Sequence, residues 1–443
     1  MSRRTSRRNF IKASAAGGVG FWVAGGVQAA PSKSALETVN FASVGVGGKG
    51  TSDSNDAAKH GNMVAICDID ENNLNKAASK WPKAKKFFDY RKMIEEMGSS
   101  IDAVTVSTPD HSHGPASALA LKAGKHCFTQ KPMSHSIHEA RVLGELAKKQ
   151  GVKTQMGNQG TANSTLRESA ALIQGGAIGT VKEVHVWTNR PVWPQGAGRP
   201  KAEPPVPKHI HWKEFLGPAK ARAYHPAYHP FKWRGWWDFG TGALGDMGCH
   251  IMDMPYWALE LKHPTRVEAD SEGNTPLSAP TASTVRYHFP AGKYSDALQF
   301  SWYDGGRMPA AEVLAESGMT SKKVAGTFDL VMVGDKGKMF FNRSNLDWLI
   351  TPDSALEDFK APEPSLPRVA NEDVEWVEAC KGGAPALSRF EKSGPFTETV
   401  LLGNLAIRLG EPVEWDGPAM KAVGCPRADR YIHRDYRRGW KLD

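Results

Sequence analysis

Short apolar runs alternate with amphipathic stretches between residues 38 and 160. The runs VNFASVGVG, MVAICDID, DAVTVST, KHCFTQ and VKTQMG are apolar or β-branched, which is typical of strands. The stretch SIHEARVLGELAKKQ has the spacing of a helix with one apolar face. Strands that alternate with helices form right-handed βαβ units, so the pattern predicts an α/β domain with a parallel sheet over residues 38–160.

The pattern changes after residue 160. Longer strand-like segments then follow one another with turns between them, among them TVKEVHVWTN, STVRYHF, SDALQFSWY and GTFDLVMVG. They predict a second domain of the α+β class over residues 161–443, built on a large and mostly antiparallel sheet. A stretch rich in Pro and Trp, residues 190–240, interrupts this domain.

The first thirty residues have the features of an export signal. SRRNFIK places two arginines before an apolar pair, an uncharged stretch rich in Gly and Ala follows, and VQA offers small residues for cleavage. The arginine pair resembles a twin-arginine signal, whose pathway carries folded proteins. We therefore expect residues 1–30 to engage the twin-arginine export machinery and the mature protein to be periplasmic. The alternative is an uncleaved N-terminal anchor.

The net charge of +9 is concentrated at the N-terminus. Arg3, Arg4, Arg7, Arg8 and Lys12 supply five of these charges, and the remaining +4 is too weak to indicate a nucleic-acid partner. With 40% apolar and 23% charged residues, the chain is expected to be globular. The five cysteines form no CxxC and no zinc-like spacing; a disulfide between Cys380 and Cys425 is left open.

The segment VGVGGKG predicts a dinucleotide site. It places Gly45, Gly47 and Gly50 in G-x-G-x-x-G spacing at the end of the first predicted strand. Such a loop brings backbone N–H groups to a pyrophosphate at a helix N-terminus. Asp68 ends the second predicted strand, where a carboxylate binds ribose hydroxyls and repels a 2′-phosphate, so NAD is favoured over NADP. The alternative is a glycine turn without a ligand.

Two further strand ends lead to the same edge of the sheet. VSTPDHSH turns at Pro109, and FTQKPM places Lys131 where nicotinamide and substrate should meet. His111 and His113 are also compatible with helix capping or packing. The expected cofactor-binding residues are Gly45, Gly47, Gly48, Gly50, Asp68, Thr108, Pro109, His113, Gln130 and Lys131.

The stretch GALGDMGCHIMD holds a polar helix face. Asp246, His250 and Asp253 lie at i, i+4 and i+7 and share one face, whereas Cys249 points away from it. This face suits a metal site, an acid/base pair or a polar helix start. Nothing nearby completes a tetrahedral or octahedral shell, so no metal is expected.

In combination these motifs resemble the Gfo/Idh/MocA family, named for glucose-fructose oxidoreductase and inositol dehydrogenase. The resemblance covers nearly the whole mature chain and rests on the glycine loop, TP with a following His, GKH, KP and DMGCHIMD. It implies an N-terminal Rossmann domain, and a C-terminal domain whose open sheet often forms an oligomer contact. It also implies oxidation or reduction of a sugar or polyol with NAD or NADP by a homo-oligomer, a dimer or tetramer.

The resemblance assigns the catalytic roles to Lys131, Asp246 and His250. In the family pattern the histidine takes the hydroxyl proton, the aspartate orients that imidazole, and the lysine hydrogen-bonds the reacting oxygen. Here the lysine motif reads QKP, with Gln130 where the family usually has Glu, and this leaves the surroundings of Lys131 open.

Aromatic residues gather just before this helix. KWRGWWDFG contains Trp236 and Trp237, whose flat faces suit sugar rings, and we expect both tryptophans and Asp253 to contact substrate. The alternative for any single Trp is a place in the core.

Export of a protein that uses NAD requires that the cofactor be captured first and recycled in place. A hydride-transferring oxidoreductase with two alternating substrates satisfies this requirement. So does a redox-neutral glycoside hydrolase acting through a 3-keto intermediate, as some relatives do, although the YPTHGLGP-like motif of one such group is absent. A third alternative is a catalytically silent carbohydrate-binding protein or scaffold.

Overall fold

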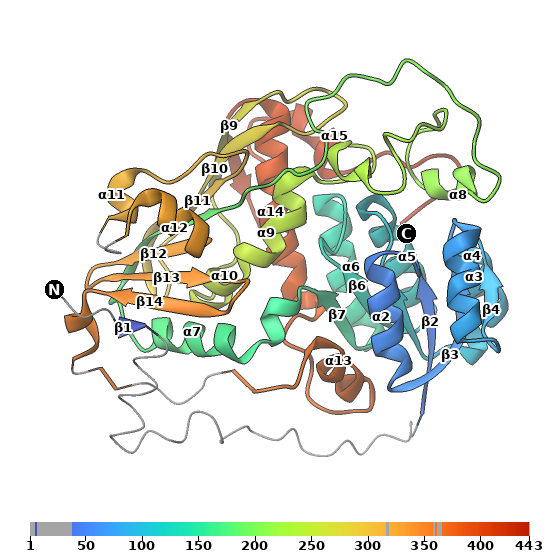
Figure 1. Cartoon of the computed structure of the whole chain (residues 1–443), viewed down its shortest axis with the longest axis horizontal. Coiled ribbons are helices and arrows are strands. Elements are labelled where there is room, and N and C mark those ends of the chain that lie inside the picture. The colour runs from blue at the N-terminus through green and yellow to red at the C-terminus, as the bar shows by residue number, and fades with distance from the viewer. Residues whose placement is uncertain (1–4, 7–37, 316–318, 358, 361–365, 443) are drawn as a thin grey trace.

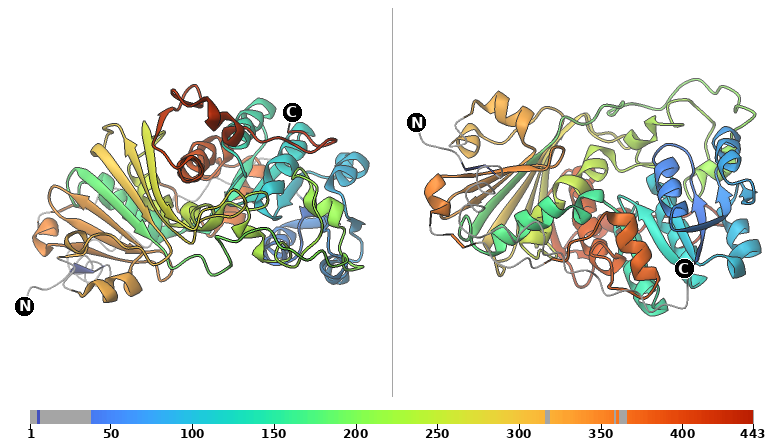
Figure 2. Two further views of the ribbon diagram at one scale, coloured as in Figure 1. Left: turned by 90° about the horizontal axis from the view of Figure 1, so that it is seen from above. Right: turned by 60° about the horizontal axis from the view of Figure 1, so that its bottom comes forward.

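The computed structural model describes residues 5–6, 38–315, 319–357, 359–360 and 366–442. They form two sheets that lie side by side, with helices packed around and between them (Figures 1 and 2). The predicted export signal lies outside the described residues except for residues 5 and 6. Among the helices of the described part, none combines the length and the apolar character that crossing a membrane requires.

The first sheet is the predicted parallel one. Its six strands have the order β4-β3-β2-β5-β6-β7, and every neighbouring pair is parallel. Helices connect successive strands, as βαβ units require. The strands are β2 (Val39–Val44), β3 (Gly61–Cys67), β4 (Lys85–Phe87), β5 (Ala103–Val106), β6 (His126–Gln130) and β7 (Thr154–Gly157). The helices are α2 (Lys49–Ala58), α3 (Glu71–Lys80), α4 (Tyr90–Met97), α5 (Asp110–Lys122) and α6 (Ile137–Gln150), with a 3-10 turn η1 (Gly98–Ser100).

Local sequence explains where these helices begin and end. Helix α6 begins with a capping box, in which the Ser136 hydroxyl accepts from the Glu139 N–H and the Glu139 carboxylate accepts from the Ser136 N–H. It ends at Gly151, whose positive φ of 65° favours glycine. The four residues of β5, AVTV, are all buried, as expected for a strand covered on both faces.

The second sheet has ten strands in the order β1-β14-β13-β12-β8-β11-β10-β9-β15-β16. Only the β8–β11 pair is parallel, so the prediction of a mostly antiparallel sheet is confirmed. Its strands are β1 (Thr5–Ser6), β8 (Val181–Trp187), β9 (Arg266–Glu272), β10 (Ala282–Phe289), β11 (Ser295–Tyr303), β12 (Leu330–Gly334), β13 (Lys338–Asn342), β14 (Asp347–Thr351), β15 (Val413–Asp416) and β16 (Lys421–Ala422).

The remaining helices lie around this sheet and between the two sheets (Figure 1). They are α7 (Ser164–Gln174), α8 (Trp212–Leu216), α9 (Gly242–Ile251), α10 (Asp253–Ala258), α11 (Ala311–Leu314), α12 (Ser321–Thr327), α13 (Glu372–Cys380), α14 (Phe390–Leu409) and α15 (Asp429–Ile432). Four 3-10 turns accompany them, namely η2 (Gln159–Ala162), η3 (Lys232–Gly235), η4 (Asp353–Leu356) and η5 (Pro426–Ala428).

Helix α14 joins the two halves. It packs against α6 of the first half, against α9, and against β9 and β10 of the second sheet. Arg141 of α6 and the fully buried Glu398 of α14 form a two-pronged ion pair with N–O distances of 2.7 and 2.8 Å. Because α14 packs against α9, it fixes α9 over the carboxyl ends of the parallel strands.

The chain also returns to the first half after the second sheet. Trp376 of α13 is buried in the same apolar cluster as Phe41 and Phe128, which belong to β2 and β6. The core under the parallel sheet therefore contains residues far outside 38–160.

Candidate functional site

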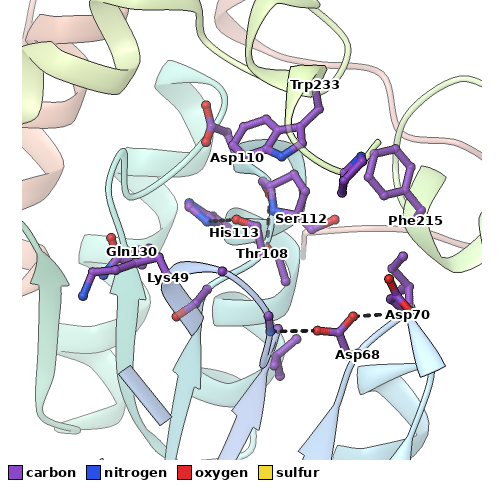
Figure 3. A pocket seen from close by; sticks show the side chains of 18 of the residues that line it. Lys49, Asp68, Asp70, Thr108, Asp110, Ser112, His113, Gln130, Phe215 and Trp233 are labelled. Atoms are coloured by element: carbon purple, nitrogen blue, oxygen red, sulfur yellow. Dashed lines mark hydrogen bonds between the residues drawn. The ribbon is translucent and has the colours of Figure 1, made fainter. Parts of the chain in front are cut away.

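A cavity of about 680 Å³ lies along the carboxyl ends of the parallel strands (Figure 3). One wall consists of the loops that follow β2, β3, β5 and β6, and the other consists of α9 and the segment between residues 214 and 234. The cavity is large enough for a dinucleotide and a small substrate together. Among the predicted cofactor residues, Gly45, Gly47, Gly48, Asp68, Thr108, Pro109, His113, Gln130 and Lys131 line it.

The glycine loop is a close-packed turn at the N-terminus of α2. Gly45 has a φ of 82°, and a Cβ there would lie 2.5 Å from the Ser107 carbonyl oxygen. A Cβ on Gly50 would lie 2.1 Å from the Gly45 carbonyl oxygen. Gly50 does not line the cavity and instead lets helix and loop approach each other. The cradle that these glycines leave open fits a pyrophosphate.

Asp68 stands at the end of β3 and organises the same loop. One carboxylate oxygen accepts from the N–H groups of Val46 and Gly47, at 2.9 and 3.2 Å, and the other accepts from Asp70 N–H at 2.9 Å. Burial raises the pKa of Asp68, and these backbone donors oppose that rise. Asp70 also lines the cavity, which places a second carboxylate at its ribose end.

His113 connects the two other strand ends. Its ring nitrogens lie 2.7 Å from the carbonyl oxygens of Pro132 and Thr108, so the ring fixes both loops from within α5. His111 does not line the cavity. Its ring meets the carbonyl oxygen of Phe215 at 2.7 Å, and burial lowers its pKa to about 3. His111 therefore has the packing role that the sequence left open.

Lys131 and Asp246 meet in the cavity although 115 residues separate them. Lys131 Nζ donates to the Asp246 carboxylate at 3.0 Å and to its backbone carbonyl at 2.6 Å. The Arg234 guanidinium lies 3.5 Å from the same carboxylate. Burial opposes ionisation of Asp246, but Lys131 and Arg234 outweigh it and hold the pKa of this carboxyl below its ordinary value.

His250 follows one turn later on α9 and also lines the cavity. Among the described residues, its ring has no hydrogen-bond partner, and no bond joins it to Asp246. Asp246 therefore orients Lys131, not His250 as the family pattern suggests, because the ammonium group captures the carboxylate. Burial, followed by the positive charge of Lys131, lowers the pKa of His250 well below its ordinary value. The ring is thus in its neutral form, with a lone pair on one of its two nitrogens.

The structure does not bring the three expected substrate residues to the cavity. Asp253 is fully buried, and its carboxylate accepts from Asn158, Thr161 and Trp257 at 2.7 to 3.0 Å. Trp236 donates to the Ala227 carbonyl and packs against Tyr228. Trp237 donates to the Thr275 carbonyl at 3.1 Å. Trp236 and Trp237 instead hold the segment before α9 in place, and Asp253 ties α10 to η2, which corrects the expected placement of all three.

Other residues of the Pro- and Trp-rich stretch take their place. Trp233 and Phe231 line the cavity, and the Arg234 guanidinium lies 4.3 and 4.6 Å from the centres of their rings. Figure 3 shows Trp233 and Phe215 above Asp68 and His113. The sequence signal for Arg234 was a cation within an aromatic run directly before α9.

Cys249, Cys380 and Cys425 lie outside this cavity. Cys249 is buried, with its pKa raised to about 12 by burial, and it does not line the cavity. Cys380 and Cys425 are free thiols, so the structure does not contain the disulfide that the sequence left open. The described residues contain no group of three His, Cys, Asp or Glu side chains arranged to hold a metal ion.

Two family models match the two halves of the chain. Residues 39–158 match the model described as an oxidoreductase family with an NAD-binding Rossmann fold, known as Gfo/Idh/MocA. Residues 167–298 match the model of its C-terminal α/β domain. Together the two matches cover more than half of the chain.

Individual relatives are distant. The NADP-dependent scyllo-inositol 2-dehydrogenase IolW of Bacillus subtilis is 25% identical over 278 residues, which are 61% of this chain and 65% of that protein. The NAD-dependent scyllo-inositol 2-dehydrogenase of the same organism is 29% identical over 118 residues, which are 27% of this chain and 31% of that protein. In both cases the match spans less than two thirds of the relative.

Solved structures share the fold. The WlbA dehydrogenase from Chromobacterium violaceum, in complex with NADH and UDP-GlcNAcA, has a TM-score of 0.60 at 18% identity and covers 88% of this chain and 99% of its own. The aldose-aldose oxidoreductase from Caulobacter crescentus has a TM-score of 0.56 at 16% identity and covers 85% and 100%.

Proposed function

Because the chain belongs to the Gfo/Idh/MocA oxidoreductase family, we propose that it transfers hydride between a sugar, polyol or sugar derivative and an NAD that stays bound and is recycled in place. One observation carries the proposal. The cavity that begins at the glycine loop and Asp68 ends at Lys131, Asp246 and His250, so one continuous space joins the dinucleotide cradle to an acid/base group.

The residues of the site would have the following roles. Bound NAD supplies the hydride acceptor. His250, which lines the cavity, takes the proton from the substrate hydroxyl on its unprotonated ring nitrogen. Lys131 donates a hydrogen bond to the reacting oxygen and stabilises the negative charge that develops on it. Asp246 fixes the Lys131 ammonium at 3.0 Å, and Trp233 offers a flat face to a sugar ring.

Three carboxylates support NAD over NADP. Asp68, Asp70 and Asp89 all line the ribose end of the cavity, and a 2′-phosphate placed there would meet a cluster of negative charge. Arg91, the cation beside them, already donates to both oxygens of Asp89.

Retention of the cofactor is proposed from the sequence signal for export. If residues 1–30 direct the folded protein to the periplasm, the nucleotide must enter before export and be recycled by a second substrate. A homo-oligomer, a dimer or tetramer, is proposed from the family resemblance alone.

Purification of the protein from cells without added cofactor tests the proposal. We expect the purified protein to contain NAD or NADH in stoichiometric amount. Addition of a reducing sugar or polyol should then change the absorbance of reduced nicotinamide by one equivalent. Release of phenol from an aryl glycoside over many turnovers without added NAD would support the redox-neutral glycosidase instead. Absence of bound nucleotide together with absence of affinity for NAD would refute both and leave the carbohydrate-binding alternative.

A further inference from the structure

The cavity extends beyond Asp68 to a wall that the catalytic proposal does not use. Strand β4 lies outside β3 in the sheet, and Phe88, Asp89 and Tyr90, which follow it, line this end together with Trp440. Trp440 comes from the other end of the chain. In Figure 1 that part of the chain leaves α15, passes α8 and ends beside α5, on the first half of the molecule.

Topology identifies what this end would hold. A dinucleotide on this fold has its pyrophosphate at the glycine loop and its adenosine ribose at the carboxylate after the second strand. The adenine is attached to that ribose and must lie on the far side of Asp68 from the catalytic residues. That is the space between the residues after β4 and Trp440.

The Trp440 ring is fixed before any ligand binds. The Arg91 guanidinium lies 3.9 Å from its ring centre, and the Tyr90 ring meets it edge-on with centroids 5.7 Å apart. Asp89 holds that guanidinium through three hydrogen bonds of 2.6 to 3.1 Å. A rigid aromatic ring binds a flat partner at little entropic cost.

Several hydrogen bonds fasten the residues around Trp440 to neighbouring elements. Arg437 donates from its side chain to the carbonyl oxygens of Gly217 and Lys213, both at 2.9 Å. Arg91 donates to the Gly439 carbonyl at 3.1 Å, and Lys122 donates to the Leu442 carbonyl at 2.8 Å. Residues 433–442, the tail segment, are thereby tied to α4, to α5 and to the loop after α8.

A second segment packs against the residues that line this end. The backbone of residues 209–211 exchanges hydrogen bonds with residues 69–71, through Glu71 N–H to the His209 carbonyl and His211 N–H to the Ile69 carbonyl, at 2.9 and 2.8 Å. The His211 ring stacks on Phe88 with centroids 3.7 Å apart. Residues 209–211 do not line the cavity themselves, but they support Phe88, which does.

We infer that the tail segment is a clamp on the cofactor, in which Trp440 packs against the adenine of the bound dinucleotide and slows its release. This inference rests on the proposed function, since it assumes that NAD binds in the cavity. The bound nucleotide would leave past Trp440 only when the hydrogen bonds of the tail segment to α4, α5 and the α8 region break.

The test compares nucleotide release from the full-length protein and three variants, Trp440→Ala, Trp440→Leu and Lys441→Ala. The loss of NADH fluorescence after addition of excess NAD gives the release rate. Stacking of an aromatic side chain on a base predicts that Trp440→Ala releases NADH about 5-fold to 100-fold faster. Trp440→Leu keeps apolar packing on Arg91, so its release rate should lie between those of the wild type and Trp440→Ala. Lys441 is exposed and does not line the cavity, so its variant should match the wild type.

Two competitors separate an adenine contact from a general loosening. AMP carries the adenine, and nicotinamide mononucleotide does not. Trp440→Ala should weaken the binding of AMP by the same factor as that of NAD and leave the binding of nicotinamide mononucleotide unaffected.

Each outcome decides one question. Equal loss for both competitors would overturn the adenine contact, as would a folded Trp440→Ala that releases NADH at the wild-type rate. If Trp440→Ala does not fold, Trp440→Leu decides by the same criteria. A wild-type protein that binds no NAD would instead refute the proposed function, and the two failures are thus distinguishable.

Discussion

Lys131, Asp246 and His250 differ in what holds each side chain before any ligand binds. Lys131 is tied to Asp246 through both carboxylate and carbonyl, whereas the His250 ring, on α9, has no hydrogen-bond partner in the described part of the chain. A fixed cation and a free neutral imidazole suit different tasks. The first stabilises charge on an oxygen, and the second moves a proton.

His250→Ala should therefore abolish turnover and leave NAD binding intact. Loss of a general base costs about 100-fold to 10,000-fold in rate, while the glycine loop that holds the pyrophosphate is unchanged. Steady-state kinetics and NAD titration measure the two effects. Cys249→Ala, one residue earlier on α9 and outside the cavity, is the matched control. Weakened NAD binding in His250→Ala with normal turnover would contradict this role.

Asp253 gives the protein a pH-dependent stability. Burial raises its pKa from 3.8 to about 7, so the folded state keeps a proton that the unfolded state has released between these values. Stability therefore falls as pH rises through this window. Between about pH 5 and about pH 8 the wild type should lose about 2 to 3 kcal/mol from this group alone.

Asp253→Asn removes that ionisation and keeps the hydrogen-bonding shape. Urea unfolding at both pH values should show that the free energy of unfolding falls with rising pH in the wild type and falls less in the variant. Parallel declines in the two proteins would mean that another group carries the effect.

At the scale of elements, the β2–α2 turn depends on close backbone approach. A Cβ on Gly50 would lie 2.1 Å from the Gly45 carbonyl oxygen, which is backbone and cannot swing aside. The loop must open to admit it, and the N–H groups that face a pyrophosphate then move.

Gly50→Ala should weaken NAD binding by at least about 10-fold, because a displaced loop loses one or more charge-assisted hydrogen bonds. Isothermal titration calorimetry measures the affinity of each variant for NAD. Gly98→Ala is the control, since Gly98 has helical angles and open space around its Cα. Equal affinities in both variants would show that the loop does not hold the pyrophosphate.

At the scale of the whole molecule, the cavity forms because α14 packs against both halves, through α6 on one side and β9 and β10 on the other. Glu398 is fully buried, and Arg141 is its bidentate partner across the joint. A buried charge without its partner is costly, whereas an exposed pair contributes little.

Arg141→Ala should lower the free energy of unfolding by about 3 to 5 kcal/mol. Lys85→Ala, which breaks an exposed pair with Glu96, should change it by less than about 1 kcal/mol. Denaturant unfolding followed by circular dichroism measures both. Similar effects in the two variants would mean that the joint does not depend on this ion pair.

The sequence by itself determined what local pattern encodes. Strand and helix periodicity, the glycine spacing and the strand-terminal Asp68 identified the parallel sheet and its ligand edge, because in parallel βαβ units all carboxyl ends share one edge. The i, i+4 spacing likewise put Asp246 and His250 on one face of α9.

Only the tertiary structure decided which distant residues meet. Lys131 captures Asp246 because α14 holds α9 over the sheet, and no local pattern carries that packing. Trp236 and Trp237 turn inward while Trp233 lines the cavity, and irregular backbone between residues 190 and 240 has no period from which such directions follow. Trp440 reaches the far end of the cavity only through long-range contacts, since side-chain direction outside helices and strands depends on the contacts available after folding.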